Sequence, residues 1–266
     1  MISSIDEATS TGRSDVGPDA LHPARALDLI LQLQGAEGPP QLLDALVSAT
    51  EAIGAAASVY SVAIPGTEAT REPFSFSLFA CDPAFAHRQQ QRGPLPDHPW
   101  FRFARNHSSP GTDRTVQIEG PADQEALALA QQHGFASCLI VPTPAGPDLH
   151  RVEMLCLGSR RHAAFEGEDA RIVRALARSL AAELHDWVTR HLSVSLKEAA
   201  RLQQIDITLL HLEWQGLGTK AISARTGLSP SAVDTRFQRL NYRLDCPNRK
   251  ASARRAAEHG LLESRG

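Results

Sequence analysis

The stretch "GLSPSAVDTRFQRL", residues 227–240, sets the expected fold of the C-terminal part of this chain. Gly227 is able to end one helix in the left-handed conformation, and Ser229 is placed to cap the next one. Pro230 then stands at the first helical position, where its missing N–H costs nothing. The stretch therefore predicts a helix, a tight turn and a second helix.

Four short helices are expected around this turn, over residues 204–215, 220–225, 230–244 and 249–259. In the third of them, apolar residues recur at helical spacing and form one face, namely Val233, Phe237, Leu240 and Leu244. We expect this face to pack on neighbouring helices through Ile222 and Leu228.

The opposite face of the third helix carries short polar side chains and arginines. Its members are Ser231, Asp234, Thr235, Arg236, Gln238, Arg239, Tyr242 and Arg243. Base edges in the major groove are told apart by hydrogen bonds, and arginines bind phosphates or guanine, so this set is typical of DNA recognition. An ordinary solvated face carries glutamates as well, and none occurs between Glu213 and Glu258. The sequence therefore predicts binding of double-stranded DNA.

Charge is divided unevenly along the 266 residues, whose formal net charge is −3. From Leu196 onward twelve Lys and Arg stand against seven Asp and Glu, a net of +5, while the preceding part carries −8. A basic C-terminal module on an acidic body indicates that the module contacts a polyanion.

The N-terminal part predicts an α/β/α layered domain with a sheet between helices. Residues 1–20 lack apolar periodicity and are expected to be disordered. The expected strands are 57–64, 74–80, 135–142 and 151–158, and the expected helices are 24–35, 40–54, 98–107, 122–134 and 167–192. The predicted class is thus α+β, with this domain over 21–190, a linker over 191–201 and a helix-turn-helix domain over 202–266.

Composition narrows the class of protein. An apolar fraction of 42% without any run of about 18 apolar residues favours a soluble cytoplasmic protein without a membrane span. Four cysteines, Cys81, Cys138, Cys156 and Cys246, show no zinc-binding spacing and are expected to be reduced thiols. Neither a metal nor a cofactor is predicted.

The helix over 167–192 has a wide apolar face. Its main stripe runs through Val173, Leu176, Leu180, Leu184, Trp187 and His191, and a second through Ile172, Ala177, Ala181 and Val188. The second stripe favours pairing with another subunit, so we expect a homodimer. The alternative is that the whole face serves the domain's own core.

Residues 202–262 resemble the C-terminal helix-turn-helix of the LuxR family. The matching residues are Gly216, Lys220, Ile222, Gly227, Leu228, Ser229, Val233, Leu240, Leu244, Arg249, Leu261 and Leu262, and the departures are Ala221, Asp234 and Arg236. The resemblance implies a transcriptional regulator that binds a pseudo-palindromic operator. Thr219, Lys220, Ser229, Arg236 and Arg243 are then expected to contact phosphates, and Ser231, Asp234, Thr235 and Arg239 to approach base edges.

The N-terminal domain resembles the autoinducer-binding domain of quorum-sensing LuxR regulators in its order of elements and in "HGFASCLIVPTPAG", residues 133–146. The resemblance places Phe85, Gln89 and His98 where that family has a tryptophan, a tyrosine and an aspartate, or Asp97 in the last role after a one-residue slip. Further lining residues are expected to be Trp100, Phe101, Phe135 and Cys138. A histidine offers at most one neutral acceptor where an aspartate offers a charged one, so we expect a small-molecule ligand other than an acyl-homoserine lactone. A closed pocket, which makes regulation independent of a ligand, is the alternative.

Two other classes of protein were weighed. An enzyme would depend on His133, Cys138 and Asp148, which lack any supporting catalytic motif, so no enzymatic activity is predicted. An anti-activator that pairs with a related regulator remains a further alternative, although that role does not require the arginine-bearing helix.

Overall fold

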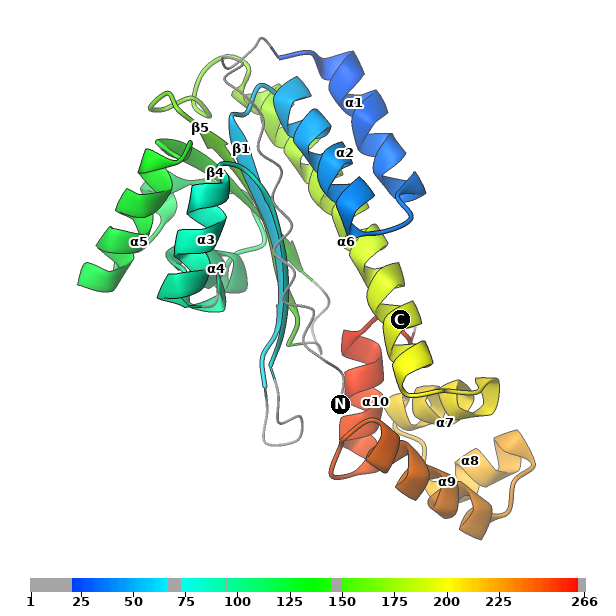
Figure 1. The fold of residues 1–266 in the computed structure, drawn as a ribbon. Coiled ribbons are helices and arrows are strands. Elements are labelled where there is room, and N and C mark those ends of the chain that lie inside the picture. Colours follow the sequence, from blue (N-terminus) through cyan, green and yellow to red (C-terminus); the bar gives the residue numbers. More distant parts are fainter. Residues whose placement is uncertain (1–20, 67–72, 94, 145–149, 263–266) are drawn as a thin grey trace.

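The computed structural model describes residues 21–66, 73–93, 95–144 and 150–262. In this part of the chain, a sheet with helices on both faces forms an N-terminal domain, and the last four helices form a smaller C-terminal domain (Figure 1). The predicted α+β class is confirmed. The expected disorder of residues 1–20 falls outside the described residues.

The sheet is antiparallel, with the strand order β2-β1-β5-β4-β3. Its strands are β1 Ala57–Ile64, β2 Phe74–Ala80, β3 Gly111–Thr112, β4 Ser137–Pro144 and β5 Val152–Ser159. The first two have the predicted bounds, and β4 and β5 are displaced by two residues and one residue from the prediction. The two-residue β3 is too short to give a sequence pattern.

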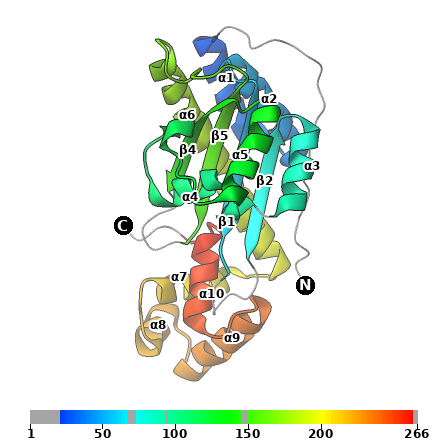
Figure 2. The same cartoon turned by 90° about the vertical axis from the view of Figure 1, so that its left-hand side faces the viewer.

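Two apolar layers form because every residue of β1 is buried and successive side chains point to opposite faces. Tyr60 and Val62 belong to the core under one helical layer, and Val59 and Ala63 belong to the other. The first layer contains α1 Pro23–Gln32, α2 Pro39–Ala52 and α6 Ala170–Ala199. The second contains α3 Pro83–Arg92, α4 Pro99–Asn106 and α5 Pro121–Gln132, which lie in front of the sheet in Figure 2.

Helix α3 is an element that the sequence analysis did not predict. Its start has ordinary signals, because the Asp82 side chain accepts a hydrogen bond from the Ala84 N–H at 2.9 Å and Pro83 follows at the first helical position. Only Phe85, Ala86 and Gln89 are buried, so the helix has no long apolar stripe to reveal it.

Helix α6 extends through the expected linker. It runs 30 residues, and Leu192 and Leu196 continue its buried face beyond residue 191. Of the stripe expected to pair with another subunit, Ala177, Ala181 and Val188 are buried in the chain's own core, and Ile172 is 43% exposed. Most of the wider apolar face of α6 therefore packs within the core of the N-terminal domain.

The C-terminal domain contains α7 Gln204–Trp214, α8 Thr219–Thr226, α9 Pro230–Arg243 and α10 Arg249–Glu258, each within one residue of its predicted bounds. Val233, Phe237, Leu240 and Leu244 are buried around Ile222, as predicted. The four helices therefore share a separate core, to which Leu196 and Ala200 at the end of α6 also belong.

The end of α10 docks on the N-terminal domain below the sheet (Figure 1). Arg151 Nη1 donates to the Glu258 carbonyl at 3.4 Å, and Nη2 donates to the Thr189 hydroxyl of α6 at 2.8 Å. The rings of His259 and Phe74 lie 5.8 Å apart. A buried arginine thus joins the start of β5, α6 and α10.

Buried charges support this arginine from within the N-terminal domain. Arg151 pairs with Glu153, and the two side chains are 2% and 0% exposed. Glu153 also accepts a hydrogen bond from the Tyr60 hydroxyl, and its Oε2 lies 3.0 Å from Nδ1 of His185. Because a buried ion is costly unless it is paired, this network fixes the Arg151 guanidinium in place.

Candidate nucleic-acid interface and ligand-binding site

The turn between α8 and α9 has the caps that the sequence predicts. Gly227 ends α8 with φ of +71°, in the left-handed region that favours glycine. Ser229 accepts a hydrogen bond from the Ala232 N–H at 3.2 Å, and Pro230 is the first residue of α9. Local sequence therefore determines the direction in which α9 leaves the turn.

The outer face of α9 is open to solvent. Of the residues expected to approach base edges, all are exposed, namely Ser231, Asp234, Thr235 and Arg239. Of those expected to contact phosphates, Lys220 and Ser229 are exposed, and Thr219, Arg236 and Arg243 are half-buried. The structure thus places the whole predicted set on α8, α9 and the turn between them.

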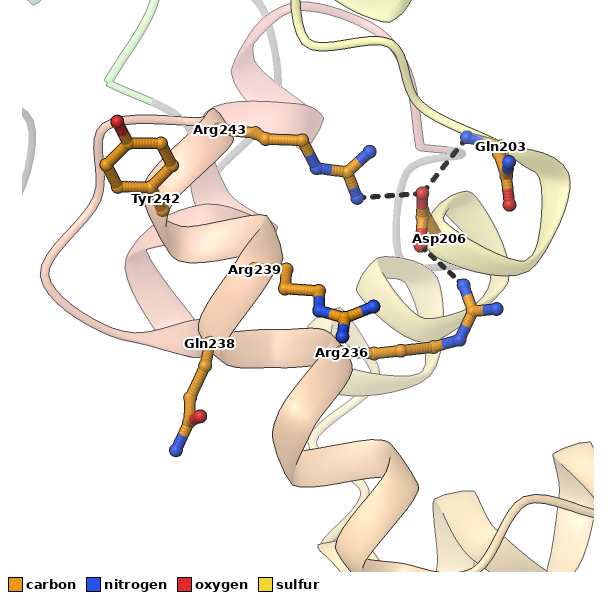
Figure 3. A pocket seen from close by; sticks show the side chains of 7 residues that line it. All are labelled: Gln203, Asp206, Arg236, Gln238, Arg239, Tyr242 and Arg243. Carbon is orange, nitrogen blue, oxygen red and sulfur yellow. Dashed lines mark hydrogen bonds and ion pairs between the residues drawn. The ribbon is translucent and has the colours of Figure 1, made fainter.

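Arg236 and Arg243 share one partner, Asp206 of α7 (Figure 3). Nη1 of Arg236 lies 3.0 Å from Oδ1 of Asp206, and Nη2 of Arg243 lies 2.9 Å from Oδ2. Oδ2 also accepts the Gln203 backbone N–H at 3.1 Å. Burial alone raises the pKa of Asp206, but this hydrogen bond and the two arginines outweigh it and lower the pKa. Asp206 is therefore a carboxylate at neutral pH.

Sequence reasoning missed Asp206. Gln203 and Asp206 form a capping box at the start of α7, in which each side chain accepts the other's backbone N–H. A polar residue followed three positions later by an acid, before an apolar run, is the signal that identifies such a cap. That signal does not reveal the arginines, which lie 30 and 37 residues further along the chain.

A second set of side-chain contacts involves Asp234. The Thr219 hydroxyl donates to Asp234 Oδ1 at 3.3 Å and accepts from Arg249 Nη1 at 2.9 Å. Arg249 also pairs with the buried Glu213 of α7 at 3.1 Å, and its guanidinium lies 5.8 Å from the centre of the Phe237 ring. The start of α8 is thereby tied to α9 and α10.

Most residues expected to bind a ligand lie together between the sheet and helices α3, α4 and α5. Those buried there are Phe85, Gln89, His98, Trp100, Phe101, Phe135 and Cys138. The rings of Phe85 and Phe135 are 5.3 Å apart, and those of Trp100 and Phe135 are 5.0 Å apart. Asp97 is exposed, so the structure places His98 and not Asp97 in this cluster.

His98 has a structural task in the cluster. Its Nδ1 accepts the Trp100 backbone N–H at 3.3 Å and so caps α4. Burial lowers the pKa of His98 to about 3, so the ring is neutral at pH 7. Because Nδ1 is the acceptor, the proton of the neutral ring is assigned to Nε2, which leaves His98 as a donor only.

Apart from the His98 ring, two buried polar atoms of the cluster lack a hydrogen-bond partner within the described residues. They are Oε1 of Gln89, an acceptor, and Nε1 of Trp100, a donor. Unpaired buried polar atoms cost free energy, so a bound molecule that supplies one donor and one acceptor is favoured here. Trp100 is among the lining residues expected from the sequence, and its indole N–H is an additional polar group there.

Two of the three residues considered for an enzyme lie within the described part of the chain. His133 Nδ1 lies 2.7 Å from a carboxylate oxygen of Asp82, and Cys138 is a buried free thiol. Asp148 falls outside the described residues. In the described part of the chain, no group of three or more His, Cys, Asp or Glu is arranged to hold a metal ion.

The helices within residues 21–66, 73–93, 95–144 and 150–262 include none with the length and apolarity needed to cross a membrane.

Comparison with known proteins identifies the fold. No protein-family model and no curated protein matches the sequence. Escherichia coli SdiA superposes with a TM-score of 0.65 at 13% identity, over 91% of this chain and 99% of that chain. SdiA in complex with octanoyl-rac-glycerol gives 0.63 at 12% identity, over 91% and 97%. CepR2 from Burkholderia cenocepacia, an N-acylhomoserine lactone dependent LuxR family transcription factor, gives 0.51 at 17% identity, over 63% and 96%. The chain therefore shares its fold with SdiA over nine tenths of its length, and with CepR2 over 63% of it.

Proposed function

We propose that this chain is a DNA-binding transcriptional regulator of the LuxR type that acts as a homodimer on a pseudo-palindromic operator. The observation that carries the proposal is the outer face of α9, where exposed Ser231, Asp234, Thr235 and Arg239 follow a capped turn. A capped helix with such a face is suited to the major groove, where short polar side chains and arginine distinguish base pairs. The shared fold with CepR2, a LuxR family transcription factor, supports the same function.

Binding selection with the full-length protein tests this proposal. We expect enriched DNA with two half-sites about 10 bp apart, and an affinity that falls steeply with salt. Arg239→Ala is the informative variant, since Arg239 is exposed and has no ion-pair partner among the described residues. It should relax the preference at one base pair of each half-site and weaken the binding free energy for the preferred site by about 1–3 kcal/mol.

The matched control is Arg225→Ala, which removes the same charge from the exposed end of α8 and should leave the base preference unchanged. If the unaltered protein retains no DNA at low salt, the proposed function is wrong.

Asp234 is the second specificity residue in this proposal. Its exposed carboxylate is placed to accept a hydrogen bond from a cytosine amine in the groove. The Thr219 hydroxyl, 3.3 Å from Oδ1, competes for one of its oxygens. Asp234→Asn should relax the preference at one further base pair, and an unchanged selected sequence would mean that Asp234 serves only Thr219.

A small molecule bound in the cluster of Phe85, Trp100 and Phe135 is the proposed regulator. His98 is a donor only, so it is unable to accept the amide N–H of an acyl-homoserine lactone, and Gln89 Oε1 is the available acceptor. An amide N–H only donates, whereas a hydroxyl both donates and accepts, so a ligand with hydroxyl groups, such as an acylglycerol, is better suited to these groups than an acyl-homoserine lactone.

Thermal shifts with defined compounds test the ligand. Octanoyl-rac-glycerol and a panel of acyl-homoserine lactones should be added separately to the purified full-length protein. A ligand at a hundred times its Kd stabilises the folded state by about 2.7 kcal/mol, which gives a measurable rise in Tm. A rise with a lactone at low micromolar concentration, and none with the acylglycerol, would refute the preference stated above.

A ligand-independent regulator is the second candidate function. The packing of the rings of Phe85, Trp100 and Phe135, with centroids 5.0–6.4 Å apart, favours it because filled space leaves less room for a ligand. In that case neither class of compound raises the Tm, and DNA binding by the purified protein is unaffected by both.

A further inference from the structure

Residues 236–243 of α9 and the start of α7 line an open hollow of about 570 Å³ (Figure 3). Arg236, Arg239 and Arg243 extend into it from one face of α9, while Gln238 points away from α7. Asp206 is the acidic residue among the lining residues, so three positive charges meet one negative charge. The hollow therefore carries a net positive charge and is suited to an anion.

Asp206 is built into the floor of this hollow. Its side chain is 3% exposed, and each carboxylate oxygen accepts from one arginine. Arg243 is held a second time, because its Nη1 donates to the Arg201 carbonyl at 2.9 Å. Three arginines at positions i, i+3 and i+7 of one helix repel one another, and each free arginine side chain has much rotamer freedom to lose on binding. By pairing with two of the arginines, Asp206 reduces both this repulsion and this loss of rotamer freedom before an anion binds.

We infer that this hollow seats a DNA backbone phosphate beside the groove that α9 enters, and that Asp206 is the positioning residue that holds Arg236 and Arg243 for it. The inference rests on the proposed function. The order of residues along α9 supports it: uncharged Ser231 and Thr235 and the acidic Asp234 precede the arginines, and two of these, Arg236 and Arg243, pair with Asp206 of α7. Arg239 is left to reach a base edge, while Arg236 and Arg243, which pair with Asp206, are the arginines held for the phosphate.

Asp206→Asn tests the inference because the two possible roles of Asp206 predict opposite changes in DNA affinity. If Asp206 only neutralises charge, its loss makes the hollow more positive, so DNA should bind more tightly and the dependence on salt should become steeper. If Asp206 positions the arginines, the same variant should bind every DNA sequence about 10-fold to 100-fold more weakly, as when one charge-assisted contact is lost. The slope of log K against log salt should also become shallower by about one unit.

Gel shifts on the selected operator and on an unrelated duplex, each over a range of salt, measure both quantities. Asp206→Glu keeps the carboxylate and should recover part of the affinity. Tighter binding by Asp206→Asn, or an unchanged slope, would overturn the inference while DNA binding by the unaltered protein still stands. Absence of binding by the unaltered protein would instead refute the proposed function.

A second variant covers the case in which Asp206→Asn does not fold, since Asp206 also caps α7. Arg236 caps no helix and its side chain is 34% exposed, so Arg236→Ala should fold. It should weaken binding of all sequences alike and lower the salt slope by about one unit more than Arg225→Ala, which removes an equal charge outside the hollow. Equal slopes for the two alanine variants would show that no phosphate is seated there.

Discussion

Gly260 and Gly227 provide a matched pair of positions to test whether the two domains dock as described. Both have φ of +71°, so an alanine at either position pays the same backbone cost, about 1–2 kcal/mol. Their surroundings differ. No atom lies within 4 Å of a Cβ built on Gly227, whereas a Cβ on Gly260 would overlap the Thr189 Cγ2 methyl and lie 3.1 Å from the Thr189 carbonyl oxygen.

The difference predicts an extra cost for Gly260→Ala. Overpacking of this kind costs about 1–3 kcal/mol, so Gly260→Ala should destabilise the chain by about 2–5 kcal/mol, against about 1–2 for Gly227→Ala. Thr189→Ser removes the overlapping methyl and keeps the hydroxyl oxygen that accepts from Arg151 at 2.8 Å. Combined with Gly260→Ala, it should restore the steric part of the loss.

Urea denaturation of the full-length variants, followed by far-UV circular dichroism, measures these differences. Small-angle scattering supplies a second readout, since a domain that no longer seats on Thr189 increases the radius of gyration. If Gly260→Ala costs no more than Gly227→Ala and the radius is unchanged, α10 does not dock against α6 in solution, and the contacts of Arg151 with α10 are refuted with it.

Three further changes have expected outcomes. Arg151→Met leaves Glu153 buried without its cation and should cost about 3–5 kcal/mol in urea denaturation, most of it recovered by adding Glu153→Gln. Burial lowers the pKa of His259 to about 4, so the unfolded chain binds more protons than the folded one below its ordinary pKa. His259 should therefore contribute a fall of about 2–3 kcal/mol in the free energy of unfolding as the pH drops from about 6.5 to 4; this part is lost in His259→Gln, and the part due to His98 remains. Ser229→Ala should cost about 1 kcal/mol of thermal stability through loss of the α9 cap.

The C-terminal helices could be predicted closely because their boundaries depend on local chemistry. Gly227, Ser229 and Pro230 each act within three residues of their own position, and a pattern of caps and breaks is visible in sequence. The strands over 57–64 and 74–80 were predicted for a similar reason, since small, β-branched and aromatic residues filled both faces of each.

Long-range contacts explain what the sequence could not show. Helix α3 was missed because its residues face solvent except for Phe85, Ala86 and Gln89, so tertiary packing and not periodicity stabilises it. The residues expected to bind a ligand were assigned by resemblance, and their gathering in one buried cluster agrees with that assignment without testing it. The Asp206 pairing and the docking of α10 join residues 30 or more positions apart, and no local pattern reports such a separation.

Strand β5 connects the aromatic cluster of the N-terminal domain to the contact with α10. Met154 and Cys156 belong to the core that contains Phe85 and Phe135, while Arg151, just before the strand, holds the end of α10. This continuity does not by itself make DNA binding depend on a ligand. A molecule in the aromatic cluster changes the docking of α10 only if it binds the docked and undocked arrangements with different affinity. Linkage then requires that DNA, by favouring one arrangement, change the affinity for that molecule by the same factor. The two factors are equal whatever the coupled step is, so docking is identified as that step only if variants at Gly260, which touch neither ligand, change the factor.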